Sequence, residues 1–282
     1  MRLFGLQLWG ELVKMSARKR TYIGFGAFFA TEAALVWLLA LPKSRAHFQR
    51  LIEASGFSFE TYWSMTSVAV VIVGLTIFIL GGNFLALVVG DIVAKETEEG
   101  SFRLLLSRPI SRLRLLILKY LAGAIYTFLL VLFIGLSSLV TGWLDRGWGG
   151  GLFVWAPEQG VFEVHPWPTG LQRFSGSLFF LALSTLTVSS IAFMFSCFRI
   201  KPATATILTV SIMIVDMILG NLPFAPSYKE YSLLNHMSVY ARIYQQPVPW
   251  LAMVRDYSFL FGMNLSCFII GWFAFQSRDF KS

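Results

Sequence analysis

The sequence has few charged residues, few cysteines and no motif for nucleotide binding. Only 13% of its 282 residues are charged, whereas a soluble domain carries about 25%. The two cysteines, Cys197 and Cys267, lie in apolar runs and are typical of small buried hydrophobic residues, so we expect no disulfide or metal framework. There is no Gly-Lys dipeptide and no Leu-Ser-Gly-Gly-Gln segment. A Walker A phosphate loop is therefore excluded.

Apolar residues, in contrast, are abundant. Hydrophobic residues make up 56% of the chain, with 27 Phe and 9 Trp, and the mean hydropathy is +0.67. A soluble core of this size could not bury so much apolar surface. A spanning helix needs about 20 mostly apolar residues, and six stretches meet or approach this length. The sequence therefore predicts an all-α membrane protein with six transmembrane helices: Tyr22–Leu41, Ser67–Gly90, Leu115–Thr141, Ser175–Phe198, Ala203–Leu222 and Leu251–Phe275.

The distribution of lysine and arginine predicts the orientation. With six spans both termini lie on one side, and that side would carry 15 of the 23 Lys and Arg residues, against eight on the other. By the positive-inside rule both termini are cytoplasmic. This asymmetry explains the net charge of +8, and we expect no nucleic-acid partner. The first apolar run is a full span behind a long basic segment, so we expect it to be retained and not cleaved as a signal peptide.

The chain divides into a cytoplasmic amphipathic segment (1–21), a six-span domain (22–275) and a cytoplasmic tail (276–282). In the first segment Gln7, Glu11, Lys14 and Arg18 recur at helical spacing, with leucines on other sides. Such a helix is expected to lie in the membrane interface. The alternative is a solvated helical lead-in.

The segments on the opposite side carry no catalytic pattern. Two long external loops, Gly142–Phe174 and Pro223–Trp250, are rich in Trp and Pro, respectively. The three histidines, His47, His165 and His236, are far apart and lack metal-ligand spacing. We therefore expect no catalytic residue, no metal and no cofactor bound by this chain.

The loop after the second span, 91–114, carries the most information. An acidic run, Glu96, Glu98 and Glu99, ends at Gly100, which can break a helix, and Ser101 is a good N-cap for a new one. A very short apolar helix is predicted to follow, ended by Pro109; its apolar residues are Phe102, Leu104, Leu105 and Leu106. An exposed apolar patch of this kind favours a partner surface. The alternative is that it lies on the lipid headgroups.

This loop resembles the cytoplasmic loop of the exporter-like ABC transporter permeases, the ABC type-2 permease family. That family's loop has an acidic stretch, Glu-Gly-Thr or Glu-Gly-Ser, a Leu-rich short helix, Ser or Thr, a Pro, Ser-Arg and a Lys at the start of the next span. The same order occurs here in Glu96, Glu98, Glu99, Gly100, Ser101, Leu104, Leu105, Leu106, Ser107, Pro109, Ser111, Arg112 and Lys119. The closing Ser277-Arg278-Asp279-Phe280 is similar to the family's usual tail.

The resemblance implies a function and partners. The segment 101–107 would be a coupling helix that docks on a separate ATPase subunit, which binds ATP and Mg²⁺, and the three glutamates could meet basic groups there. Two ATPase chains and two permease chains would form the unit, and we expect two copies of this chain. The chain would be the permease of an exporter in a bacterial inner membrane.

Two acidic residues fall inside predicted spans, Glu32 in the first and Asp216 in the fifth. A charge at the bilayer centre costs about 2.5–3.5 kcal/mol on insertion scales, so it normally faces protein or water. Either residue could line the translocation path or a subunit interface. The alternative for Glu32 is a hydrogen bond to Thr, Ser or Asn83 of a neighbouring helix.

Other functions remain open from sequence. An ATPase-independent secondary transporter or channel would show broken spans at matching positions in two halves, and we find no clear symmetry. A lipid-modifying enzyme would need a catalytic constellation, which we cannot assemble. A membrane anchor for an ATPase that does not transport is compatible with the sequence.

Overall fold

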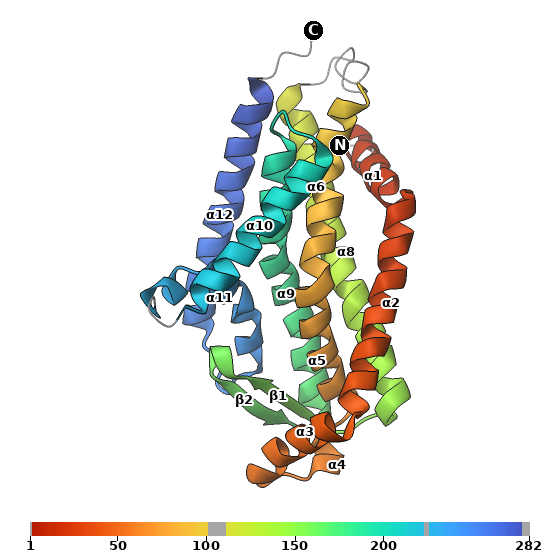
Figure 1. The fold of residues 1–282 in the computed structure, drawn as a ribbon, viewed down its shortest axis with the longest axis vertical. Helices are drawn as coiled ribbons and strands as arrows, with labels where there is room; N and C mark the ends of the chain where they lie inside the picture. The colour runs from red at the N-terminus through yellow and green to blue at the C-terminus, as the bar shows by residue number, and fades with distance from the viewer. Residues whose placement is uncertain (1, 101–110, 223–225, 278–282) are drawn as a thin grey trace.

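The computed structural model describes residues 2–100, 111–222 and 226–277. Six of its helices are long and apolar enough to cross a membrane, so the prediction of an all-α, multi-pass membrane protein is confirmed. The bundle is drawn in Figure 1. The six candidate spans are Thr21–Ala40, Met65–Glu98, Arg112–Arg146, Trp167–Ser196, Pro202–Gly220 and Trp250–Gln276.

These spans are built from named elements. α2 (Lys19–Ala40) forms the first, and α5 (Met65–Thr76), the π-helical η1 (Ile77–Gly81) and α6 (Gly82–Glu98) run together as the second. The remaining four are α8 (Arg112–Arg146), α9 (Trp167–Ser196), α10 (Pro202–Gly220) and α12 (Trp250–Gln276). Pro202 begins α10, as predicted. α6 ends at Glu98, and Gly100 has a φ of +68°, which agrees with the predicted helix break.

Several helices are longer than predicted. α8 has 35 residues, which at 1.5 Å per residue makes it about 52 Å long, whereas the hydrocarbon core is about 30 Å thick. The second span continues beyond Gly90 to Glu98. Hydropathy marks only the lipid-covered part of a helix, so it underestimates helices whose polar ends project from the membrane.

Smaller elements lie at the end of the bundle away from the termini and, in the case of α11, near mid-height (Figure 1). They are α3 (Pro42–Ala54), α4 (Phe59–Tyr62), β1 (Leu152–Ala156), η2 (Pro157–Gln159), β2 (Val161–His165), η3 (Pro226–Glu230), α11 (Leu233–Met237) and η4 (Ser238–Tyr244). β1 and β2 form an antiparallel hairpin in which Leu152 pairs with His165. The hairpin was not predicted. Gly160 closes its turn with a φ of +64°, a left-handed conformation that favours glycine.

α9 lies at the centre of the bundle and packs against α6, α8, α10 and α12. Small residues allow close approach there: a Cβ on Gly135 of α8 would come within 2.4 Å of the Leu178 side chain of α9. Close contacts at small residues are a usual means of helix association in membranes.

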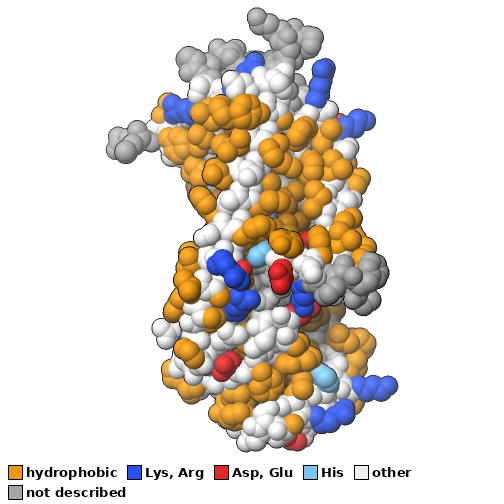
Figure 2. Space-filling model, turned by 90° about the vertical axis from the view of Figure 1, so that its left-hand side faces the viewer, with side chains coloured by type: hydrophobic (Ala, Val, Ile, Leu, Met, Phe, Trp, Pro, Cys, Tyr) orange, Lys and Arg blue, Asp and Glu red, His pale blue; other side chains and the backbone are white. Residues whose placement is uncertain are grey.

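Both ends of the described chain lie at the same end of the bundle, where α1 (Arg2–Ser16) also lies (Figure 1). On the face shown in Figure 2, hydrophobic side chains form a broad band in the upper part of the molecule. Charged side chains gather beneath it, near mid-height. We call the end with the termini the terminal end and the other the hairpin end.

Candidate functional site

At the terminal end, α1 turns its polar face toward the bundle. Gln7 Oε1 accepts a hydrogen bond from Arg114 Nη2 of α8 at 3.1 Å. Arg18, the residue before α2, places its Nη1 3.8 Å from Asp91 Oδ2 of α6. The exposed residues of α1 are largely apolar, for example Leu6 at 69% and Trp9 at 66%. An amphipathic helix with this arrangement presents its apolar side to lipid. The polar side, which sequence alone left to interface or solvent, binds the protein.

A buried lysine holds α1, α6 and α8 together. Lys119 of α8 is 0% exposed, and its ammonium lies 2.9 Å from Glu11 Oε2 of α1 and 2.8 Å from Glu96 Oε2 of α6. It also donates to the carbonyl of Ile92 at 3.3 Å. Lys14 adds contacts to Glu11 at 2.9 Å and to Glu96 at 3.5 Å. We call Glu11, Lys14, Glu96 and Lys119 the lysine cluster.

The lysine cluster shifts the pKa values of its two α1 residues, Glu11 and Lys14. Burial raises the pKa of the Glu11 carboxyl, but the ammonium groups of Lys119 and Lys14 outweigh this effect, so the pKa is lowered overall. Burial lowers the pKa of Lys14, but the hydrogen bond and the electrostatic attraction to Glu11 outweigh this effect, so the pKa is raised overall. Both shifts favour the charged forms and thus the docked position of α1.

The predicted coupling segment lies between α6 and α8. Glu98, Glu99 and Gly100 are exposed at the end of α6, and Lys95 lies 3.9 Å from Glu99. Glu96, by contrast, is buried and contacts Lys14 and Lys119 of its own chain. The remaining predicted coupling residues lie outside the described residues: Ser101, Phe102, Leu104, Leu105, Leu106 and Pro109.

Glu32 lies in the interior, between α2 and α8. Its side chain is 1% exposed and accepts hydrogen bonds from three hydroxyl groups of α8: Ser137 at 2.6 Å, Ser138 at 3.3 Å and Thr141 at 3.2 Å. Asn83 instead donates to Ile79 O of its own helical segment. The arrangement matches the interhelical alternative stated above, with serine and threonine as the partners.

Asp216 lies near the hairpin end of α10 and is buried. Its carboxylate accepts hydrogen bonds from the Tyr228 and Ser232 hydroxyls at 2.8 and 2.9 Å, and from the backbone N–H groups of Leu233 and Leu234 at 3.1 and 2.8 Å. Four donors satisfy this carboxylate, which therefore anchors η3 and α11 to α10.

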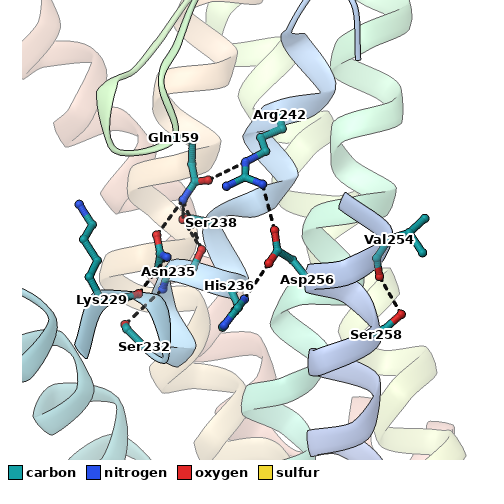
Figure 3. Close-up of polar contacts among 10 residues, drawn as sticks. All are labelled: Gln159, Lys229, Ser232, Asn235, His236, Ser238, Arg242, Val254, Asp256 and Ser258. Carbon is teal, nitrogen blue, oxygen red and sulfur yellow. Dashed lines mark hydrogen bonds and ion pairs between the residues drawn. The ribbon is translucent and has the colours of Figure 1, made fainter. Parts of the chain in front are cut away.

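A second polar network, drawn in Figure 3, joins the hairpin to α12. Asp256 of α12 is buried and bridges His236 Nδ1 and Arg242 Nη1, each at 3.0 Å. Arg242 Nε donates to Gln159 Oε1 at 3.0 Å, and the Gln159 amide donates to Asn235 Oδ1 at 3.1 Å. Within the described ranges, no group of three His, Cys, Asp or Glu residues is placed to hold a metal ion.

His165, the last residue of β2, is fully buried. Its Nε2 lies 2.7 Å from the Tyr244 carbonyl and must donate there, so Nδ1 accepts from the Gln246 amide at 3.0 Å. Burial, aided by the charge of Arg173, lowers the pKa of this imidazole despite the opposing effects of the Tyr244 bond and Glu163. His165 therefore supports the fold of the hairpin end as a neutral histidine.

A cavity of about 750 Å³ opens between the second span, α9 and α10. Its wall is mostly apolar, and the residues of η1 and their neighbours face it, including Ile77, Phe78 and Ile79. A π-helical segment in a span is frequent at functional sites. Neither Glu32 nor Asp216 lines this cavity.

A smaller chamber of about 240 Å³ adjoins the cavity at the hairpin end. Its lining contains Asp216, Glu158, Lys229, Asn221 and Asn235, so it is more polar. Pockets of a few hundred to about 1,000 Å³ with apolar walls and a few polar groups are typical ligand sites.

The fold and these sites define a polytopic α-helical membrane protein with a half-open cavity between its spans and a charged junction at the terminal end. The chain belongs to the family described as "Protein of unknown function (DUF2705)", whose match covers residues 28–281. It is also similar to "Uncharacterized protein YhcI" of Bacillus subtilis (strain 168), with 36% identity over 72 residues. That match covers 26% of this chain and 23% of the relative. No solved structure matches.

Sequence reasoning missed the lysine cluster, the network around Asp256 and the cavity. Lys119 carried one signal, since a charge seven residues into an apolar helix needs a partner. The sequence gives no way to choose Glu11 among the available acids, because it is 108 residues away. The cavity depends on side-chain packing among three spans and has no signature in the sequence.

Proposed function

We propose that this chain is the membrane-spanning permease subunit of an ABC exporter in a bacterial inner membrane, driven by a separate ATPase. The observation that carries the proposal concerns the two helices that flank the motif-bearing segment. α6 ends and α8 begins at the terminal end, and Lys119 joins the two helices through Glu96. A displacement of this loop would therefore be transmitted to two spans at once.

The second span offers a route from the loop to the cavity. α6 continues through η1 into α5, and residues of α5, η1 and α6 line the cavity wall. Closure of two ATPase subunits would displace segment 101–107 and, through α6, the wall that contains Phe78. Packed helices transmit such displacements because they shift as units.

Co-purification tests the proposal. The detergent-solubilised chain is isolated from its native membrane as wild type, as Leu105→Asp and as Leu144→Asp. Leu144 is exposed at the opposite end of α8, so it provides the same substitution away from the loop. A nucleotide-binding ATPase that accompanies wild type and Leu144→Asp, and is lost with Leu105→Asp, is the expected result.

Other outcomes would overturn the proposal. Absence of an ATPase from the wild-type preparation would favour the ATPase-independent transporter or channel. An ATPase that binds while its hydrolysis moves no substrate in reconstituted vesicles would favour the anchor.

A further inference from the structure

The cavity and the smaller chamber lie side by side and share part of their lining. Five residues line both of them: Phe78, Glu158, Met217, Leu234 and Ser238. The combined site has an apolar part between the spans and a polar part beside η3 and α11. A ligand that occupies the whole site would need one apolar portion and one polar portion.

The apolar part of the site has few polar groups that need a hydrogen bond from a ligand. Most of the hydroxyl groups on its wall are bonded within the protein, and Tyr240 also lines it. Thr185 donates to Leu181 O at 2.8 Å, and Thr209 donates to Ala205 O at 2.9 Å. Ser184 lies 3.2 Å from the Tyr257 hydroxyl. An alkyl chain can occupy such a space without leaving buried polar groups unpaired.

The polar part offers one charge of each sign. Asp216 also lines it, but four donors already satisfy that carboxylate. Glu158 and Lys229 are exposed there, and Figure 3 shows the Lys229 side chain pointing away from the Asn235–His236 network. A head group that carries both a cation and an anion would be complementary to this pair.

We propose that the two chambers together bind one amphiphile, with its alkyl chain between the spans and a zwitterionic head group between Glu158 and Lys229. This inference names a substrate class for the proposed exporter and rests on the proposed function for the transport step. Binding itself needs only this chain, so its failure and the failure to find an ATPase are separate results.

Native mass spectrometry of the purified chain in a non-ionic detergent tests the proposal, with lysophosphatidylcholine as the probe. Ile214 of α10 lines the cavity and is 47% exposed, whereas Ile212, on the same helix and 38% exposed, does not line it. We expect one saturable adduct, weakened about tenfold or more by Ile214→Trp because the indole would occupy part of the space that the alkyl chain needs. Ile212→Trp should bind like wild type.

The head group is tested separately. Lys229→Gln and Glu158→Gln should each weaken lysophosphatidylcholine about two- to fivefold, as for an exposed charge pair, and should not alter binding of a fatty alcohol with the same chain. Met217→Trp, which also lines both chambers, replaces Ile214→Trp if that variant fails to fold.

Three results would overturn the inference. The first is equal binding by Ile214→Trp and Ile212→Trp. The second is an unsaturable series of adducts, which would identify an adventitious amphiphile only. The third is a wild-type dimer that Ile214→Trp converts to monomers, which would mean that a second copy covers the cavity.

Discussion

Glu32 shows how a carboxyl group is retained in the interior of a helix bundle. Three hydroxyl groups of one neighbouring helix point at it, and each hydroxyl can also donate to its own backbone or turn to accept. A carboxyl group in such a place can be either protonated or charged without losing its partners.

We expect Glu32→Gln to fold like wild type, because the carboxamide still accepts and donates across the α2–α8 contact. Glu32→Leu should lower the thermal unfolding midpoint, since interhelical hydrogen bonds in membranes contribute about 0.6–2 kcal/mol. Thermal unfolding in detergent measures both. Equal midpoints for the two variants would contradict the role described for this contact. A role in the path would also be excluded if Glu32→Gln kept full transport and ATPase coupling.

His165 predicts a pH dependence. Its pKa is lowered in the fold, so below about pH 6.5 the unfolded chain binds more protons than the folded one, and folding stability falls as the pH falls. The thermal midpoint should therefore be lower at pH 5.5 than at pH 7.5. His165→Gln can keep both hydrogen bonds and should reduce this difference. His47→Gln, at an exposed site, should leave it intact, and a difference unchanged in His165→Gln would contradict the assignment.

At the scale of elements, the lysine cluster fixes α1. Removing one member of a buried ion pair leaves an unpaired charge and costs about 3–5 kcal/mol, whereas an exposed pair contributes about 0–1 kcal/mol. Lys119→Ala should therefore destabilise the protein strongly and make α1 sensitive to limited proteolysis. Lys95→Ala, which removes the exposed contact to Glu99, is the matched control. Similar proteolysis of the two variants would show that the cluster does not hold α1.

A second element depends on Asp216. Asp216→Ala should release η3 and α11, because two backbone N–H groups and two hydroxyls lose their acceptor, at about 1–3 kcal/mol for a buried unsatisfied donor. Faster hydrogen exchange at Leu233 and Leu234, with little change at the hairpin, is the expected result. Unchanged exchange at these two amides would refute it.

Elements differ in how well the sequence predicts them. Apolar runs located all six spans, since length and hydropathy alone decide whether a helix can cross lipid. The ends were wrong for α6 and α8, whose polar turns are held by packing and by Lys119. The hairpin was missed because its strands are five residues each and lie in the Trp-rich segment that was predicted only as a long external loop. Its Val, Phe and Trp content was a usable signal.

At the scale of the whole molecule, the distribution of lysine and arginine predicts which end faces the cytoplasm. The packing of the helices carries no information about this orientation. Cys197 and Cys267 are buried, so an introduced cysteine can be labelled over a low background. Glu53→Cys at the hairpin end should react with a membrane-impermeant maleimide in intact cells, whereas Glu98→Cys at the terminal end should react only after permeabilisation. The reverse pattern would invert the predicted topology.

The buried Lys119 also has a consequence for biogenesis. Synthesis proceeds from the N-terminus, so both carboxylates that receive this ammonium, Glu11 and Glu96, have left the ribosome before it does. The third span therefore need not enter lipid with the Lys119 ammonium unpaired, because the carboxylates of Glu11 and Glu96 have already been synthesised. The order of these residues in the sequence thus allows the helices that carry the acidic partners to be inserted before the helix that carries Lys119.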